Sequence, residues 1–140
     1  MKKILVPCDG SGNALRAVRY AASVAKECAD VQLELLHVQD PVPLKMHAAL
    51  SNQEIASIQA DEAARVLKPA GQILDVEEVP FSAQSRAGAP AAEIARHARE
   101  AGCDAIIMGT RGMGPIGSVV IGSVVTRVIH LVDVPVTLIK

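Results

Sequence analysis

The sequence predicts a doubly wound α/β fold, in which a five-stranded parallel sheet of order 3-2-1-4-5 carries helices on both faces. Half of the residues are hydrophobic, yet Tyr20 and Phe81 are the only aromatic ones, so the core must be built from Val, Ile, Leu and Ala. Short apolar runs alternate with segments of helical periodicity along the chain. Such alternation requires right-handed crossovers between parallel strands, which place helices on both sides of the sheet.

Five apolar segments are predicted to form the strands, near residues 2–8, 31–38, 76–86, 104–109 and 134–139. Unbroken apolar runs are typical of strands covered on both faces. The third segment differs, because Pro80 and the polar tail up to Arg86 indicate an edge strand. If the last segment is terminal, it is an exposed apolar edge, and such edges pair with other chains. We therefore expect a homodimer formed by antiparallel pairing of residues 134–139 about a two-fold axis.

Helical spacing predicts helices over residues 13–29, 51–67, 90–100 and 118–131. The first has Ser11 or Asn13 as a candidate N-terminal cap, because short polar side chains accept hydrogen bonds from the first free N–H groups. The second opens with Ser51 and Glu54 at the spacing of a capping box. These caps indicate where the first two helices begin.

Proline and glycine indicate the other helix ends. The second helix is expected to end before Pro69 and Gly71, since proline inside a helix removes a hydrogen bond. The third starts at Pro90, a position that proline tolerates, and Gly102 fits its C-terminal cap. Residues 39–50 are predicted to be a long irregular connection.

Length and charge limit the class of protein. The chain fits one domain over residues 1–140, and its 14 basic and 15 acidic residues provide no positive surface for nucleic acid. No apolar run approaches the roughly 20 residues of a membrane span, and no signal peptide is visible, so a cytoplasmic protein without nucleic-acid or membrane partners is expected. Cys8, Cys28 and Cys103 lack CxxC spacing and are interpreted as reduced thiols, mostly in the core.

The most informative motif is the glycine-rich run GTRGMGPIGSVVIGS, from Gly109 to Ser123. It follows a predicted buried strand and precedes a predicted helix. Glycine lets a ligand approach the backbone closely, and a helix N-terminus attracts anions, so the run is a candidate phosphate site. Its spacing is neither GxGxxG nor that of a P-loop. The last helix could also begin later than residue 118, near Gly122, which would leave residues 113–121 as a loop around the phosphates.

A second polar turn, from Pro7 to Ser11, follows the first strand. In the predicted order the first and fourth strands are neighbours where the winding reverses, and ligands of doubly wound sheets bind beyond the strand ends at this point. The turn and the glycine-rich run are therefore expected to face one crevice, with the end of the second strand, His37 to Gln39, nearby.

The glycine-rich run resembles the nucleotide-binding signature of the universal stress protein family, which is glycine, two residues, glycine, nine residues, glycine, then Ser or Thr. The opening ILVPCDGSGNAL, HVQD after the second strand, GAPAAEI at the third helix and the closing VPVTLIK extend the resemblance over essentially the whole chain. The resemblance implies a single-domain, dimeric protein that binds ATP, ADP or AMP, with Mg²⁺ held through phosphate oxygens and water.

The resemblance also implies a role for individual residues. Asp9 would meet the ribose or the base edge, and Val38 would bind adenine through its backbone. Arg111 would line the phosphate path, and Ser123 would hold phosphates. The complete set of implied binding residues is Pro7, Asp9, Val38, Met108, Gly109, Arg111, Gly112, Gly122, Ser123 and Val124. No catalytic residue and no protein ligand for a metal is predicted.

Each of these residues also has a simpler interpretation. Asp9 could form a turn that caps the first helix, Arg111 could be a solvated loop charge, and Ser123 could be only an N-terminal cap. The run contains no lysine, and Asp9 is the only acid expected at the crevice, so binding is favoured over phosphoryl transfer. The leading hypothesis is a nucleotide-sensing regulator with an unidentified protein partner, in which ATP orders residues 110–122 and also 39–50. The alternatives are a slow ATPase or phosphotransferase and a dimeric scaffold with a vestigial pocket.

Overall fold

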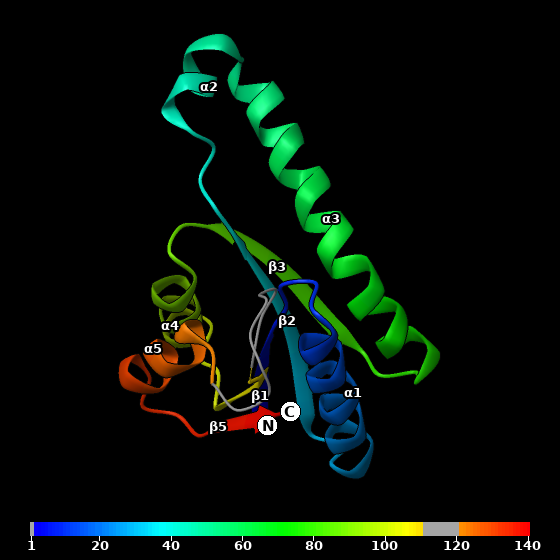
Figure 1. Cartoon of the computed structure of the whole chain (residues 1–140). Coiled ribbons are helices and arrows are strands. Elements are labelled where there is room, and N and C mark those ends of the chain that lie inside the picture. Colours follow the sequence, from blue (N-terminus) through cyan, green and yellow to red (C-terminus); the bar gives the residue numbers. More distant parts are fainter. Residues whose placement is uncertain (1, 111–120) are drawn as a thin grey trace.

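The computed structural model describes residues 2–110 and 121–140. These residues form a five-stranded sheet in the order β3-β2-β1-β4-β5, with each neighbouring pair parallel (Figure 1). The predicted fold class and strand order are confirmed. The strands are β1 (Lys2–Pro7), β2 (Val31–Gln39), β3 (Phe81–Ala87), β4 (Ala105–Gly109) and β5 (Val136–Ile139).

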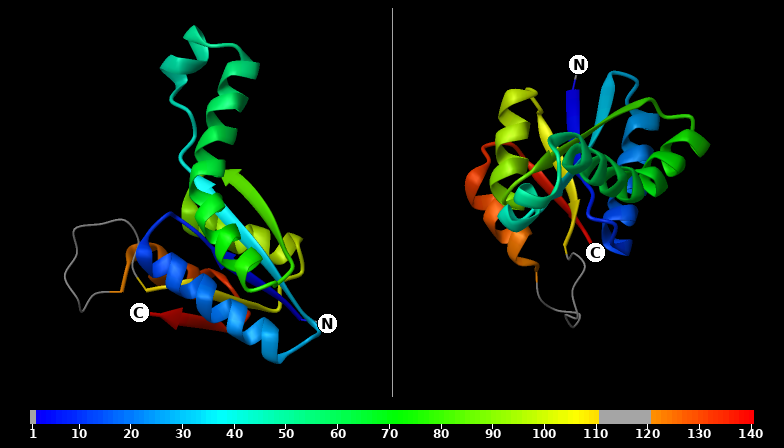
Figure 2. Two further views of the ribbon diagram at one scale, coloured as in Figure 1. Left: turned by 90° about the vertical axis from the view of Figure 1, so that its right-hand side faces the viewer. Right: turned by 90° about the horizontal axis from the view of Figure 1, so that it is seen from above.

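Helices cover both faces of the sheet (Figure 2). α1 (Gly12–Glu27) and α3 (Asn52–Val76) pack on one face, and α4 (Pro90–Glu100) and α5 (Ser123–Leu131) pack on the other. The short α2 (Leu44–Ala49) and the first turns of α3 extend away from the sheet (Figure 1). Within the described parts of the chain, no helix is both long enough and apolar enough to cross a membrane.

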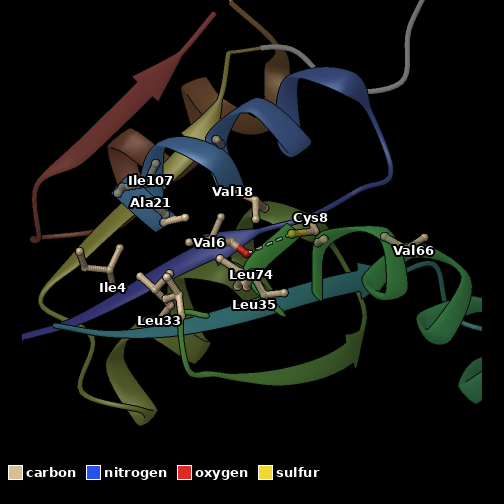
Figure 3. Close-up of a cluster of buried hydrophobic side chains, with 14 residues drawn as sticks. Ile4, Val6, Cys8, Val18, Ala21, Leu33, Leu35, Val66, Leu74 and Ile107 are labelled. Carbon is tan, nitrogen blue, oxygen red and sulfur yellow. Dashed lines mark hydrogen bonds between the residues drawn. The ribbon is translucent and has the colours of Figure 1, made fainter. Parts of the chain in front are cut away.

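Alternation along the strands divides the core into two layers. Successive side chains of a strand point to opposite faces, so an unbroken apolar run supplies both layers at once. The layer under α1 and α3 is shown in Figure 3 and includes Ile4, Val6, Val18, Leu33, Leu35, Val66 and Leu74. The layer under α4 and α5 includes Leu5, Leu36, Ile94, Ile106, Met108 and Val128.

The prediction that the second long helix ends before Pro69 was wrong. α3 continues through Pro69 and Gly71 to Val76. Pro69 is on the exposed side, where water can satisfy the carbonyl that loses its partner, while Leu74 is fully buried against the sheet. Packing of the last two turns therefore outweighs the local preference of proline to end a helix.

Three other boundaries differ from the predictions. The third strand begins at Phe81 rather than 76, because the preceding residues finish α3 and turn through Glu78, whose φ is 57°. Residues 39–50, predicted to be irregular, contain α2. α5 begins at Ser123, so the later of the two predicted starts is the observed one.

The predicted caps are present. The Ser11 side chain accepts a hydrogen bond from the Ala14 N–H at 3.1 Å. Ser51 and Glu54 form both hydrogen bonds of a capping box. After α4, Gly102 has φ +66°, the left-handed conformation that a C-terminal glycine cap requires.

A buried ionic cluster between the sheet and α4 was not predicted. Glu34, in the middle of β2, is only 4% exposed, and its carboxylate oxygens face Lys3 Nζ at 3.1 Å and His97 Nε2 at 3.2 Å. Arg86 Nη1 lies 3.2 Å from His97 Nδ1. Because arginine can only donate, His97 Nδ1 is the acceptor of this hydrogen bond. His97 Nε2 lies close to Glu34 Oε1 but has no hydrogen-bond partner among the described residues.

Arg86 connects this cluster to α4. Its Nε donates to Glu93 Oε2 at 2.9 Å, and its Nη1 donates to Glu100 Oε2 at 3.1 Å. The hydrogen bond to Glu100 raises the pKa of Arg86 above its already high ordinary value, so the guanidinium stays charged. The charged groups therefore join β1, β2 and β3 to one helix.

Candidate nucleotide site

The two polar turns lie together where the winding of the sheet reverses, between β1 and β4. Asn13, in the first turn of α1, donates from Nδ2 to Thr110 Oγ1 at 3.2 Å, just after β4. A Cβ atom placed on Gly109 would lie 2.8 Å from the backbone carbonyl carbon of Asn13. The structure thus has the juxtaposition expected from the strand order.

The turn after β1 is shaped by Asp9 and Gly10. Asp9 is exposed, and its Oδ1 accepts a hydrogen bond from the Ser11 N–H at 2.9 Å. Gly10 has φ +86°, a conformation that favours glycine. Asp9 therefore forms the turn of the simpler interpretation, although Ser11 and not Asp9 caps α1. The turn uses one of the two carboxylate oxygens of Asp9. Pro7, the last residue of β1, is half-buried beside this turn.

Val38 presents its backbone to the space beyond the end of β1. The pairing of β1 with β2 ends with Pro7 opposite Leu36, and the Cys8 N–H then donates to the Leu36 carbonyl at 2.8 Å. Because backbone groups alternate sides along a strand, Val38 turns its N–H and C=O in the same direction as Leu36. These groups point to the edge where β1 has already ended.

The glycine-rich run leaves the sheet and returns at the same place. Met108 is 5% exposed and belongs to the core under α4 and α5. The chain leaves β4 after Gly109, and the Gly122 N–H donates to the Thr110 carbonyl at 2.8 Å where the chain returns. Arg111 and Gly112, which were predicted to line the phosphate path, lie outside the described residues.

The N-terminus of α5 opens at this point. Gly122 is its N-cap, and no side chain in the described part of the protein forms a capping hydrogen bond there. The first intrahelical donor after the cap is the Thr126 N–H, which leaves the N–H groups of Ser123 and Val124 without a helical carbonyl. Ser123 is exposed and Val124 half-buried. Such an end is suited to a phosphate group.

Backbone N–H groups and the Asp9 carboxylate lie at the crevice. The described residues contain no group of three or more His, Cys, Asp or Glu that could hold a metal. A nucleotide that brings its own phosphate oxygens needs few protein ligands for Mg²⁺. The N–H groups at the start of α5 can donate to an anion, and the second carboxylate oxygen of Asp9 can accept from a hydroxyl group.

Sequence reasoning gave no role to His37, which the structure places directly behind the crevice. His37 is 6% exposed, and its Nδ1 lies 2.9 Å from the Cys8 carbonyl oxygen. Burial, followed by the nearby Asp9 charge, raises the pKa of the Cys8 thiol to about 12. Cys8 therefore stays a neutral core residue, as its predicted packing role requires. The only signal for His37 in the sequence was a histidine inside a predicted buried strand.

Known proteins resemble this chain over its whole length. The universal stress protein family matches residues 1–140. The universal stress protein MJ0531 of Methanocaldococcus jannaschii is 32% identical over 140 residues, which cover 99% of this chain and 82% of that protein. A universal stress protein of Thermus aquaticus is 31% identical over 139 residues, covering 99% and 98%.

A solved structure adds a similarity in three dimensions. The universal stress protein from Archaeoglobus fulgidus in complex with dAMP aligns with a TM-score of 0.74 at 26% identity, covering 100% of this chain and 98% of that chain. Family, relatives and fold agree over both halves of the sheet and over the turns at its reversal. On these grounds the chain belongs to the universal stress protein family.

Proposed function

We propose that this protein binds an adenine nucleotide in the crevice between β1 and β4 and acts as a nucleotide-responsive regulatory protein. The observation that carries the proposal is the convergence of three backbone features at one end of the sheet: the Asp9 turn, the Val38 backbone and the uncapped start of α5. The dAMP complex of the Archaeoglobus fulgidus relative supports this class of ligand.

The proposed arrangement assigns one part of the ligand to each feature. Adenine binds the N–H and C=O of Val38, and the ribose meets Asp9. The phosphates lie on the N–H groups of Ser123 and Val124, where the helix dipole favours negative charge. Mg²⁺, when present, is held by phosphate oxygens and water.

The residues of the glycine-rich run favour nucleotide binding over phosphoryl transfer. Phosphoryl transfer needs cations to neutralise developing charge and a group that orients the nucleophile. The run from Gly109 to Ser123 has no lysine and no acid, and Arg111 is its single cation. Asp9 belongs to the ribose end of the proposed site.

Substitution of Gly122 with valine tests the phosphate end. Gly122 has φ −62° and ψ 155°, which any residue can adopt, so the variant should fold. A branched side chain beside the Ser123 and Val124 N–H groups should obstruct phosphate, and we expect the Kd for ATP to rise by at least about tenfold. The Kd for AMP should change less, because AMP depends more on the base and ribose contacts. Isothermal titration calorimetry measures both.

The matched control is Ile129→Val, on the exposed side of the same helix, which should leave both constants unchanged. Equal ATP affinity in Gly122→Val and in the unchanged protein would contradict the phosphate assignment. Phosphate release followed in the same samples separates binding from hydrolysis. Steady release that Gly122→Val abolishes would favour the slow ATPase instead.

Regulation would operate through the segment that follows Val38. Residues 39–50 lead directly from the proposed adenine contact to α2, which extends away from the sheet (Figure 1). A ligand held by Val38 would restrict the start of this segment. We propose that a protein partner reads that change.

We also propose a homodimer formed through β5. β5 is an edge strand, and Ile106 and Thr110 donate to the carbonyls of Pro135 and Ile139 on its β4 side. By alternation, Val136 and Leu138 direct their backbone groups to the open side, where a second β5 can pair. Sedimentation velocity at micromolar concentration should give a dimer, and a monomer there would contradict the proposal.

A further inference from the structure

We propose that His37 is a positioning residue of the nucleotide site, which holds the Asp9 turn and the Val38 backbone at a fixed distance from each other. The inference rests on the proposed function, because the two groups that it connects are the proposed ribose and adenine contacts. His37 immediately precedes Val38 on β2, and its side chain reaches the carbonyl of Cys8, the residue immediately before Asp9.

The argument begins with the proton on the imidazole. A carbonyl oxygen can only accept, so His37 Nδ1, at 2.9 Å from the Cys8 oxygen, carries the proton and donates. The Cys8 N–H in turn donates to the Leu36 carbonyl at 2.8 Å. Both peptide groups of Cys8 are thus held by β2, although β1 ends one residue earlier. The peptide that leads into Asp9 is therefore fixed in orientation.

The turn beyond that peptide has one further internal restraint, the hydrogen bond from Ser11 N–H to Asp9 Oδ1. Loss of the His37 hydrogen bond would leave the Cys8 carbonyl free to rotate. Asp9 would then move relative to Val38. The Asp9 side chain is exposed among the described residues, so burial does not resist that rotation.

Stability alone does not explain a histidine at this position. In the neutral ring the second nitrogen, Nε2, is an acceptor, and it is buried without a hydrogen-bond partner among the described residues. An unsatisfied buried polar atom is costly, and the neighbouring inward positions of β2, Leu33 and Leu35, are leucine. A leucine at 37 would continue this pattern at no polar cost. The hydrogen bond to Cys8 is what the histidine adds.

The test compares His37→Leu with His37→Asn in the full chain. Leucine has similar volume and no donor, whereas the asparagine amide nitrogen branches from Cγ at the place of Nδ1 and can donate to the same carbonyl. With AMP in isothermal titration calorimetry, we expect about a tenfold rise in Kd for His37→Leu and a change within about twofold for His37→Asn. The ratio of the ATP and AMP constants should stay unchanged in both variants, unlike in Gly122→Val.

A double-mutant cycle with Asp9→Ala separates positioning from general structural support. If His37 acts through Asp9, His37→Leu should weaken AMP binding much less in the Asp9→Ala background. Additive losses, or equal AMP affinity in His37→Leu and the unchanged protein, would overturn the inference. If His37→Leu fails to fold, His37→Gln replaces it. The glutamine amide is one bond farther from the backbone than His37 Nδ1, so it is not placed to donate to the Cys8 carbonyl. If the protein without any substitution binds neither AMP nor ATP, the proposed function is overturned instead.

Discussion

Replacing Lys3 with methionine is expected to lower the free energy of unfolding by about 3 kcal/mol at pH 7. Lys3 Nζ lies 3.1 Å from Glu34 Oε2, and the Glu34 side chain is 5% exposed. Methionine keeps the length of the side chain and removes the charge, so the carboxylate is left buried with His97 as its remaining partner. Removal of one member of a buried ion pair is costly because the other stays desolvated. Chemical denaturation in urea measures the loss.

The matched control is the same substitution at Lys26. Lys26 Nζ and Glu77 Oε2 are only 2.5 Å apart, but both side chains are about half exposed. Water replaces the lost partner there, so Lys26→Met should cost less than about 1 kcal/mol despite the shorter distance. Equal losses for the two variants would contradict the burial argument.

The same cluster shows why part of the fold could not be predicted. Sequence patterns identify strands by their apolar residues, and they interpret charged residues as solvent-facing. Glu34 lies between Leu33 and Leu35 in a strand predicted to be buried, which was a signal that a buried partner must exist. That partner could not be named, because Lys3 and His97 reach it only through the packing of β1 and α4 on β2.

The length of α3 illustrates the second limit. The start of α1 follows from the Ser11 cap, and the bounds of α4 follow from Pro90 and Gly102, which are local signals that sequence analysis recognises. α3 passes through Pro69 because long-range packing decides where the helix ends. A Cβ atom on Gly71 would lie 3.0 Å from Phe81 Cζ, so this glycine lets the helix lie close to β3. Local rules treat proline and glycine as helix breakers and contain no information about Phe81.

The proximity of the two polar turns was more predictable than the packing around them. This proximity follows from strand order, since the ends of β1 and β4 must be neighbours in a 3-2-1-4-5 sheet. The start of α5 at Ser123 agrees with the later of the two predicted starts, near Gly122, and not with the start at residue 118 that the apolar spacing indicated. The role of His37 could not be predicted, because a hydrogen bond from its side chain to the Cys8 carbonyl depends on the register between β1 and β2.

Substitution of Gly109 with alanine is expected to lower the free energy of unfolding by about 2 to 3 kcal/mol. The new Cβ would lie 2.8 Å from both the carbonyl carbon and the Cβ of Asn13, and 3.0 Å from its carbonyl oxygen. Backbone atoms of a helix cannot turn aside as a flexible side chain can, so α1 and β4 must separate. Asn13 also donates to Thr110, and this hydrogen bond would be strained.

Gly12→Ala is the matched control, because Gly12 is adjacent to Asn13 in the first turn of α1. Among the described residues, a Cβ there would meet only the Arg16 guanidinium, at 3.7 Å, and alanine in a helix should raise stability by about 0.4 to 1 kcal/mol. Equal stability of the two variants would show that α1 moves away from β4 without cost. If Gly109→Ala is destabilised without any ligand present, the first glycine of the signature is required for packing of α1 on β4. In that case a loss of nucleotide binding on mutation of Gly109 would not by itself identify a phosphate contact. Substitution of Gly122 is the better test of phosphate contact, because its backbone conformation suits any residue.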